Sequence, residues 1–242
     1  MKHSPITLAL LATGSLLLTG CNSPDTAEKI PARQAPTETS ETPETIAMET
    51  KPTAPDQTAV ARNLVNMQAA YKGETTATAK YAAYAQKAAG EGFPQIALLY
   101  RAISAAETVH AGNHKAVLAE SGASVPVITP EYTVKSTRES LQDDIKGEAY
   151  EAATMYPDFL KTAAAAGNDL AVISLTYAQK TEKRHEGMYQ RALAALDKQA
   201  LPTLPTAYFI CPTCGNTYEN TAPARCGISL TKGGLFSKIA AL

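Results

Sequence analysis

The sequence predicts an all-α fold: a four-helix bundle with a long crossover between its second and third helices, followed by a small C-terminal metal knuckle. Ala, the strongest helix former, accounts for 44 of the 242 residues. Four Cys in 242 residues are too few for a disulfide scaffold. The 22 basic and 23 acidic residues nearly balance, so the chain has no electrostatic footprint for nucleic acid.

Residues 1–20 are expected to be a lipoprotein signal peptide. A short basic start precedes an apolar run over 6–18 that is too short to span a bilayer comfortably. The run ends in Leu18-Thr19-Gly20-Cys21, which resembles a bacterial lipobox, the signal in which Cys becomes acylated. We therefore expect a lipid on Cys21 to anchor the protein at the periplasmic face of a membrane. Asn22 after the Cys favours the outer membrane in a Gram-negative cell.

Residues 21–58 are expected to form a disordered tether rich in Pro, Thr and Glu. From residue 22 on, the segment holds six Pro, eight Thr and seven acidic residues against three basic ones. It shows no apolar periodicity, so it cannot bury enough surface to offset its ordering entropy. We expect it to hold a folded domain away from the membrane.

Residues 59–200 are expected to form the bundle, because apolar residues recur there at three- and four-residue steps. The predicted helices cover 59–89, 94–120, 137–166 and 169–199. Pro157 lies inside the third and is expected to kink it. Short links join the first pair and the second pair, whereas 121–136 is a long connection. Two short-linked pairs joined by a long crossover are typical of the ferritin-like arrangement.

The two halves of the bundle resemble each other in sequence. Lys72-Gly73-Glu74 returns as Lys146-Gly147-Glu148 with an offset of 74. A Glu-x-x-His motif at Glu107 and His110 returns at Glu182 and His185 with an offset of 75. Each motif lies near the middle of its predicted helix, so packing the four helices brings the motifs to one depth.

The repeated Glu and His residues predict a site for two metal ions. A Glu and a His three apart share one face of a helix. A Glu from each of two helices plus Glu-x-x-His from each of the other two is the di-metal carboxylate pattern. Imidazole ligands favour a transition metal such as iron over magnesium or calcium. Taken alone, Glu182 to Glu186 would suit a solvated helix face, but two of the three His after the signal follow a Glu at equivalent places. The chain has no His-Glu-x-x-His, Gly-x-Ser-x-Gly or phosphate-loop motif.

From about 60 to 200 the chain resembles rubrerythrins. The resemblance lies in Gly73-Glu74-Thr75, Tyr81, Glu91-Gly92-Phe93, Glu107-x-x-His110-Ala111, Gly147-Glu148-x-x-Glu151, Met155-Tyr156-Pro157 and Glu182-x-x-His185. It implies two iron ions with five constant ligands: Glu74, Glu107, Glu148, Glu182 and His185. It also implies that Glu151 and His110 exchange on one iron with redox state. The first-half counterpart of Glu151 is Ala77, so Glu151 breaks the twofold symmetry.

The resemblance extends to residues around these ligands. Tyr81 and Tyr156 match tyrosines that hold ligand carboxylates in the family, although spacing alone would equally suit ordinary core tyrosines. His114 has no His at its repeat position, where Tyr189 stands instead. We therefore interpret His114 as a structural residue.

Residues 207–242 resemble the rubredoxin-like tail of rubrerythrins. Cys211 and Cys214 form a Cys-x-x-Cys-Gly knuckle, in which a turn aims two sulfurs at one metal. The second pair of the family is incomplete here, because Cys226 is followed three residues later by Ser229. Three thiolates with Ser or water could hold iron at an altered potential, hold zinc, or bind metal weakly. A disulfide between Cys211 and Cys214 is the alternative in an oxidising compartment. Because Ser229 replaces the fourth Cys, the sequence does not predict electron transfer through this site.

The resemblance implies a non-haem di-iron peroxidase that reduces hydrogen peroxide in oxidative stress defence, and the lipobox at Cys21 adds the lipid anchor. Its electron donor is not identified by the sequence, and a homodimer is expected. Two other functions remain open at this stage: a ferritin-like ferroxidase that oxidises and sequesters iron, and a metal-binding lipoprotein without catalysis.

Overall fold

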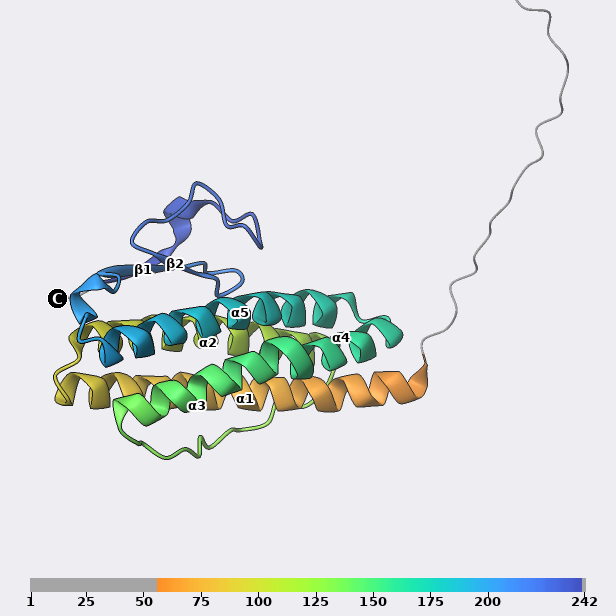
Figure 1. Ribbon diagram of the computed structural model, residues 1–242. Coiled ribbons are helices and arrows are strands. Elements are labelled where there is room, and N and C mark those ends of the chain that lie inside the picture. The colour runs from red at the N-terminus through yellow and green to blue at the C-terminus, as the bar shows by residue number, and fades with distance from the viewer. Residues whose placement is uncertain (1–55, 241–242) are drawn as a thin grey trace, which may run out of the picture. The chain divides into compact units, whose positions relative to one another are not determined.

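The computed structural model describes residues 56–240, which form a bundle of long helices with a small three-stranded sheet on one side (Figure 1). The expected signal peptide, Cys21 and nearly all of the expected tether lie outside the described residues. Among the helices that the structure describes, none combines the length and the apolar character needed to cross a membrane. The helices are α1 (Gln57–Gly90), α2 (Pro94–Glu120), α3 (Thr137–Tyr150), α4 (Tyr156–Ala165) and α5 (Asp169–Asp197).

Side chains at the helix starts explain where the helices begin. The Asp56 carboxylate accepts a hydrogen bond from the Thr58 backbone N–H at the start of α1. Ser136 and Glu139 form a capping box at the start of α3, in which each side chain satisfies the other residue's backbone N–H. The Asn168 side chain caps α5 by accepting from the Ala171 N–H. The predicted ends of the first, second and fourth helices lie within two residues of those in the structure.

The third predicted helix differs from the expectation. Instead of one helix kinked at Pro157, the chain forms α3, a π-helical segment η1 (Glu151–Met155) and α4. The Tyr156 N–H bonds to the Glu151 carbonyl five residues back, which widens the helix by one residue. Pro157 then falls in the first turn of α4, where its missing N–H costs nothing. The irregularity therefore precedes the proline.

The bundle core consists of two apolar clusters with a polar layer between them. One cluster contains Tyr81, Tyr100 and Tyr189 with their neighbours on α1, α2 and α5. The other contains Met67, Leu118, Tyr156, Leu175 and their neighbours. Along each long helix, the Glu and His motifs lie between residues of the first cluster and residues of the second. The polar layer is thus sealed from above and below by apolar side chains.

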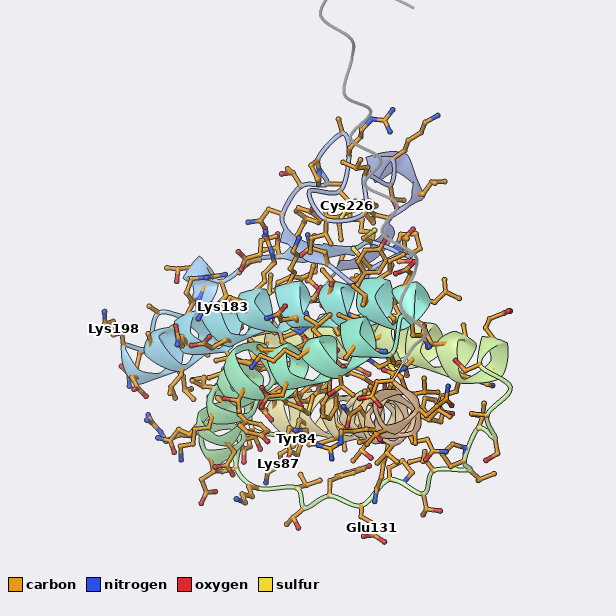
Figure 2. The ribbon with its side chains drawn as sticks, turned by 90° about the vertical axis from the view of Figure 1, so that its right-hand side faces the viewer. Tyr84, Lys87, Glu131, Lys183, Lys198 and Cys226 are labelled. Carbon is orange, nitrogen blue, oxygen red and sulfur yellow. The ribbon has the colours of Figure 1, made fainter. Side chains whose placement is uncertain are left out.

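The crossover 121–136 runs along the outside of the bundle, as Figure 1 shows. The Tyr84 hydroxyl donates to the Thr133 carbonyl at 2.9 Å, and Glu91 accepts from the Thr137 N–H at 2.9 Å. These bonds attach the crossover to α1. In Figure 2, Glu131 of the crossover and Cys226 of the C-terminal tail lie on opposite sides of the bundle.

The C-terminal tail forms an antiparallel sheet packed against α2 and α5. A short 3-10 turn η2 (Leu201–Thr203) ends the bundle and leads into β1 (Ala207–Ile210), β2 (Thr217–Glu219) and β3 (Ser237–Ala240), with a second 3-10 turn η3 (Gly233–Leu235) before β3. The strand order is β2-β1-β3. The Cys-x-x-Cys turn connects β1 to β2 and faces the middle of the bundle.

Candidate metal centre

Six of the seven predicted bundle ligands meet between the two apolar clusters. Their ligand atoms form two groups, and within each group all atoms lie within 4.8 Å of one another. Glu107 and Glu182 belong to both groups. The first group adds Glu74 and His110, and the second adds Glu148 and His185. All six side chains are buried.

The two shared carboxylates connect the two groups. His110 Nδ1 lies 2.8 Å from Glu107 Oε2 and 3.1 Å from Glu182 Oε1. His185 Nδ1 lies 3.1 Å from Glu107 Oε1 and 2.9 Å from Glu182 Oε2. Each shared carboxylate therefore turns one oxygen toward each imidazole, which is the arrangement that bridges two neighbouring cations.

The donor set fits metal ions better than it fits hydrogen bonds. Both carboxylate oxygens of Glu182, Oε2 of Glu148 and Nδ1 of His185 are buried without a hydrogen-bond partner among the residues that the structure describes. Glu182 Oε2 is close to His185 Nδ1, but their geometry is not that of a hydrogen bond. Buried polar atoms are normally satisfied, so converging unsatisfied lone pairs indicate a cation between them.

Without a cation the layer is electrostatically unfavourable. Burial, followed by repulsion from Glu107 and Glu182, raises the pKa of Glu74 well above its usual value, and burial raises the pKa of Glu148 in the same way. Burial lowers the pKa of His185, but the neighbouring Glu107 and Glu182 carboxylates together outweigh it and bring the pKa to about 9. The layer therefore holds protons in places where bound metal would supply positive charge.

Two tyrosines orient the outer carboxylates. The Tyr81 hydroxyl donates to Glu148 Oε1 at 2.8 Å, and the Tyr156 hydroxyl donates to Glu74 Oε1. Both hydroxyls are buried, and burial raises the pKa of each phenol well above its usual value, so both remain protonated donors. The structure thus puts Tyr81 and Tyr156 at opposite ends of the layer, each against one outer Glu.

Glu151 lies beside the layer on the π-helical segment and belongs to neither ligand group. Burial and the charges of Glu182 and Glu107 raise the pKa of its carboxyl to about 8. His110 instead points its Nδ1 into the first group. Of the pair expected to exchange, the structure therefore places His110 inside the layer and Glu151 next to it.

The outer nitrogens of both imidazoles contact the tail. His110 Nε2 lies 3.0 Å from the Cys214 carbonyl, and His185 Nε2 lies 3.2 Å from Thr217 Oγ1. With Nδ1 directed at a metal, Nε2–H donates outward and fixes the orientation of the ring. Gly215 permits this approach, because a Cβ there would lie 2.4 Å from His110 Nε2 and its φ is +74°.

Two further buried groups lie near the layer, of which the sequence analysis had named only His114. His114, expected to be only structural, lies 2.8 Å by Nδ1 from Ser174 Oγ and 3.4 Å by Nε2 from the Tyr156 hydroxyl. Asp144 is buried, pairs with Lys80 at 3.1 Å and accepts from the Tyr100 hydroxyl at 2.9 Å. Asp144 lies one helical turn before Glu148, and this spacing is a signal that could have placed it on the inward face.

The tail gathers its three cysteines into a second candidate metal site. The Sγ atoms of Cys211, Cys214 and Cys226 lie within 4.8 Å of one another, and all three are buried free thiols. Ser229 Oγ lies 3.2 Å from Cys211 Sγ, where the family's fourth Cys would stand. Burial raises the pKa of Cys226, but hydrogen bonds to its sulfur, including those from the Ser229 N–H and the Tyr218 hydroxyl, outweigh this and bring the pKa to about 6. Three sulfurs and one hydroxyl fit a single four-coordinate metal ion.

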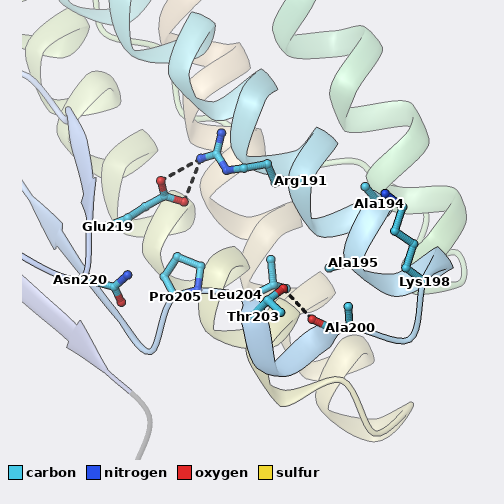
Figure 3. Close-up of a pocket in the computed structure, with 10 residues that line it drawn as sticks. All are labelled: Arg191, Ala194, Ala195, Lys198, Ala200, Thr203, Leu204, Pro205, Glu219 and Asn220. Atoms are coloured by element: carbon cyan, nitrogen blue, oxygen red, sulfur yellow. Dashed lines mark hydrogen bonds and ion pairs between the residues drawn. The ribbon is translucent and has the colours of Figure 1, made fainter.

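A surface cleft of about 410 Å³ is lined by residues other than the predicted ligands (Figure 3). It is lined by the end of α5 and by residues of the tail, and Arg191 crosses it to donate to both carboxylate oxygens of Glu219 at 2.8 Å. The cleft contains none of the predicted ligands. Its ion pair helps to attach the tail to α5.

Comparison with known proteins shows the family to which the chain belongs. A family model described as Rubrerythrin matches residues 66–193. Nigerythrin from Nitratidesulfovibrio vulgaris is 36% identical over 177 residues, covering 72% of this chain and 85% of that protein. Rubrerythrin-2 from Clostridium acetobutylicum is 30% identical over 171 residues, covering 70% and 92%. A solved structure of fully reduced, all-ferrous nigerythrin matches with a TM-score of 0.66 at 31% identity, covering 79% of this chain and 91% of that one. The chain therefore belongs to the rubrerythrin family of ferritin-like di-iron oxidoreductases.

Proposed function

We propose that the protein reduces hydrogen peroxide at its di-iron site while a lipid on Cys21 holds it at the periplasmic face of a membrane. The observation that carries the peroxidase activity is the asymmetry of the layer. His110 occupies the first ligand group, and the additional carboxylate of Glu151 lies beside it on the π-helical segment. A symmetric site for iron storage needs no seventh side chain.

The side chains of the layer have distinct roles in this proposal. Glu107 and Glu182 would be shared by the two metals, Glu74 and His110 would hold one, and Glu148 and His185 would hold the other. When bound, the two iron ions supply the two electrons that peroxide reduction consumes. Tyr81 and Tyr156 keep the outer carboxylates oriented, and the two apolar clusters exclude water from above and below.

Stopped-flow kinetics of the reduced protein test the activity. We expect oxidation by hydrogen peroxide to be at least tenfold faster than oxidation by O₂, with turnover when a reductant is supplied. Faster reaction with O₂ and accumulation of ferric iron would instead indicate a ferroxidase. Two bound irons that react with neither oxidant over many minutes would indicate metal binding without catalysis.

Cell fractionation tests the anchor. Cys21→Ser should release the protein from membranes or block its maturation, because this one residue is proposed to carry the lipid. A matched Ser23→Ala variant should remain on the membrane. The anchor is disproved if wild type and Cys21→Ser associate equally with membranes and both retain Met1.

A further inference from the structure

We propose that Ser174, His114 and Tyr156 form a proton-entry route from a surface pocket to the di-iron site. The route rests on the proposed function in one respect, because peroxide reduction is the reaction that would consume its protons. The route itself is a property of the described side chains, and it can be measured without that reaction.

The three side chains form a continuous hydrogen-bonded chain. Ser174 Oγ lies 2.8 Å from His114 Nδ1, and His114 Nε2 lies 3.4 Å from the Tyr156 hydroxyl oxygen. The Tyr156 hydroxyl in turn contacts Glu74 Oε1 inside the metal layer. Ser174 is 4% exposed, and the other two are fully buried. Bulk water therefore has access only at the Ser174 end.

The hydrogen bonds point in one direction. With metal bound, Glu74 is an ionised ligand whose oxygens only accept, so the Tyr156 hydroxyl donates to Glu74 and the Tyr156 oxygen accepts from His114 Nε2–H. A neutral imidazole with a hydrogen on Nε2 has a free lone pair on Nδ1, which accepts from the Ser174 hydroxyl. All three donors are thus aligned from the surface toward the metal layer.

A surface pocket supplies the outer end. It has a volume of about 210 Å³, lies between α2 and α5, and is lined by Ser174 together with Asn113, Val117, Leu170, Ile173 and Tyr177. Ser174 is the lining residue that also bonds to His114. Water in the pocket can therefore reach the first hydroxyl of the chain.

The second half of the bundle provides an internal comparison. Tyr189 occupies the position that corresponds to His114, and its ring packs 5.7 Å from that of Tyr81. The Tyr189 hydroxyl is buried and has no hydrogen-bond partner within residues 56–240. Within the described residues, the Tyr81 end of the layer therefore has no equivalent series of hydrogen bonds. At the Tyr156 end, His114 in place of a tyrosine makes such a series possible.

The transfer balances in protons and electrons. Reduction of H₂O₂ to two H₂O breaks the O–O bond, forms two O–H bonds and consumes two electrons and two protons. The electrons come from the reduced iron pair. For each proton, a hydronium ion in the pocket gives one hydrogen to Ser174 Oγ and becomes water, while Ser174 passes its own hydrogen to His114 Nδ1, Nε2–H passes to Tyr156, and the Tyr156 hydrogen goes to an oxygen released from the O–O bond. The chain is restored when the hydroxyls turn and His114 regains its first tautomer.

Hydrogen exchange in the zinc-loaded protein tests the route without any activity, because zinc is diamagnetic and redox-inert. NMR measures how fast the His114 Nε2 hydrogen exchanges with solvent. We expect Ser174→Ala to slow this exchange at least tenfold and Tyr189→Phe to leave it unchanged. Ser174→Val serves as a second variant, because its larger side chain excludes a water that might replace the hydroxyl. Unchanged exchange in both Ser174 variants overturns the route.

Single-turnover oxidation of the iron-loaded protein by peroxide tests its use. His114→Ala should keep both irons, react about tenfold slower than wild type, and recover with added imidazole. Where His114→Ala loses metal, His114→Gln replaces it. A slow metal-loaded variant that imidazole does not restore overturns the route through His114. Slowed exchange in the Ser174 variants together with a wild type that does not reduce peroxide supports the route and disproves the proposed function.

Discussion

At the scale of single residues, the two halves of the site are nearly equivalent. We therefore expect the residues that differ between the halves to give the site functions beyond metal binding. The bridging Glu107 and Glu182 are repeat partners, as are His110 and His185. Glu151 has Ala77 as its counterpart, and His114 has Tyr189. A twofold site could bind two metals without either Glu151 or His114. Both differences bear on the first ligand group, where Glu74 and His110 lie.

The exchange of Glu151 and His110 makes a prediction that separates oxidation states. With His110 in the first group, Glu151→Ala should still bind two irons in the reduced state. Its oxidised state should lose iron, because ferric iron favours the harder carboxylate ligand, and peroxide turnover should fall at least tenfold. His110→Ala should show the reverse bias. Iron content measured anaerobically and after oxidation checks both variants.

Equal loss of iron from both variants in both states would make Glu151 and His110 constant ligands. Glu131→Ala, on the exposed crossover opposite the tail, provides a carboxylate control that should match wild type in both states.

Glu148 tests the ligand layer itself. Glu148→Ala should lower bound metal from two ions to one or none, because it removes one outer ligand and leaves the Tyr81 hydroxyl without its acceptor. Metal analysis and the absorption of the oxidised site measure the loss. Retention of two metals with unchanged absorption would exclude Glu148 as a ligand.

At the scale of elements, the helices and the ligand pattern could be predicted, but two local features could not. The predicted ends of the first, second and fourth helices lie within two residues of those in the structure, because local residues such as Pro94 and the Asn168 cap mark them. The π-helical segment at Glu151–Met155 adds one residue to a helical turn, and no sequence pattern marks it. The sequence instead indicated a kink at Pro157, which lies just after this segment. The contact of Cys214 with His110 joins residues 104 apart through a backbone carbonyl, which carries no side-chain signal.

The docking of the tail on the bundle makes a prediction at Gly215. Gly215→Ala places a methyl group 2.4 Å from His110 Nε2 and 3.0 Å from the Ala106 carbonyl, so the turn must move away. We expect the hydrogen bond between His110 and the Cys214 carbonyl to break. The metal ion held by the ligand group of His110 should then bind at least tenfold more weakly. Competition with a chelator measures the affinity.

Gly227→Ala is the matched control, because a Cβ there meets only the Tyr218 hydroxyl at 3.7 Å. If Gly215→Ala binds both metals as tightly as this control does, the tail does not support His110.

At the scale of the whole molecule, the metal layer and the fold depend on each other. The layer buries four carboxylates and two imidazoles between two apolar clusters. Without metal, like charges at this depth are avoided only by taking up protons. With metal, the same groups are deprotonated ligands. Because the metal binds only the folded protein, its binding free energy adds to the free energy of unfolding. Acidity should therefore affect the metal-free and metal-bound proteins differently.

Thermal unfolding across pH 5–9 measures this difference. The folded pKa of Glu151 is about 8 and that of His185 about 9, both above the values of an unfolded chain. Over this range the folded, metal-free protein holds protons that the unfolded chain releases, so its stability falls as pH rises. Each such proton lowers the free energy of unfolding by about 1.4 kcal/mol per pH unit, or Tm by about 3–5 °C. The chelator-treated protein should show this fall, whereas the zinc-loaded protein should show little change, because bound metal takes the place of the proton on His185 and its positive charge lowers the pKa of the neighbouring Glu151. Equal slopes with and without metal would mean that the bound ions do not sit among Glu151, His185 and their neighbours.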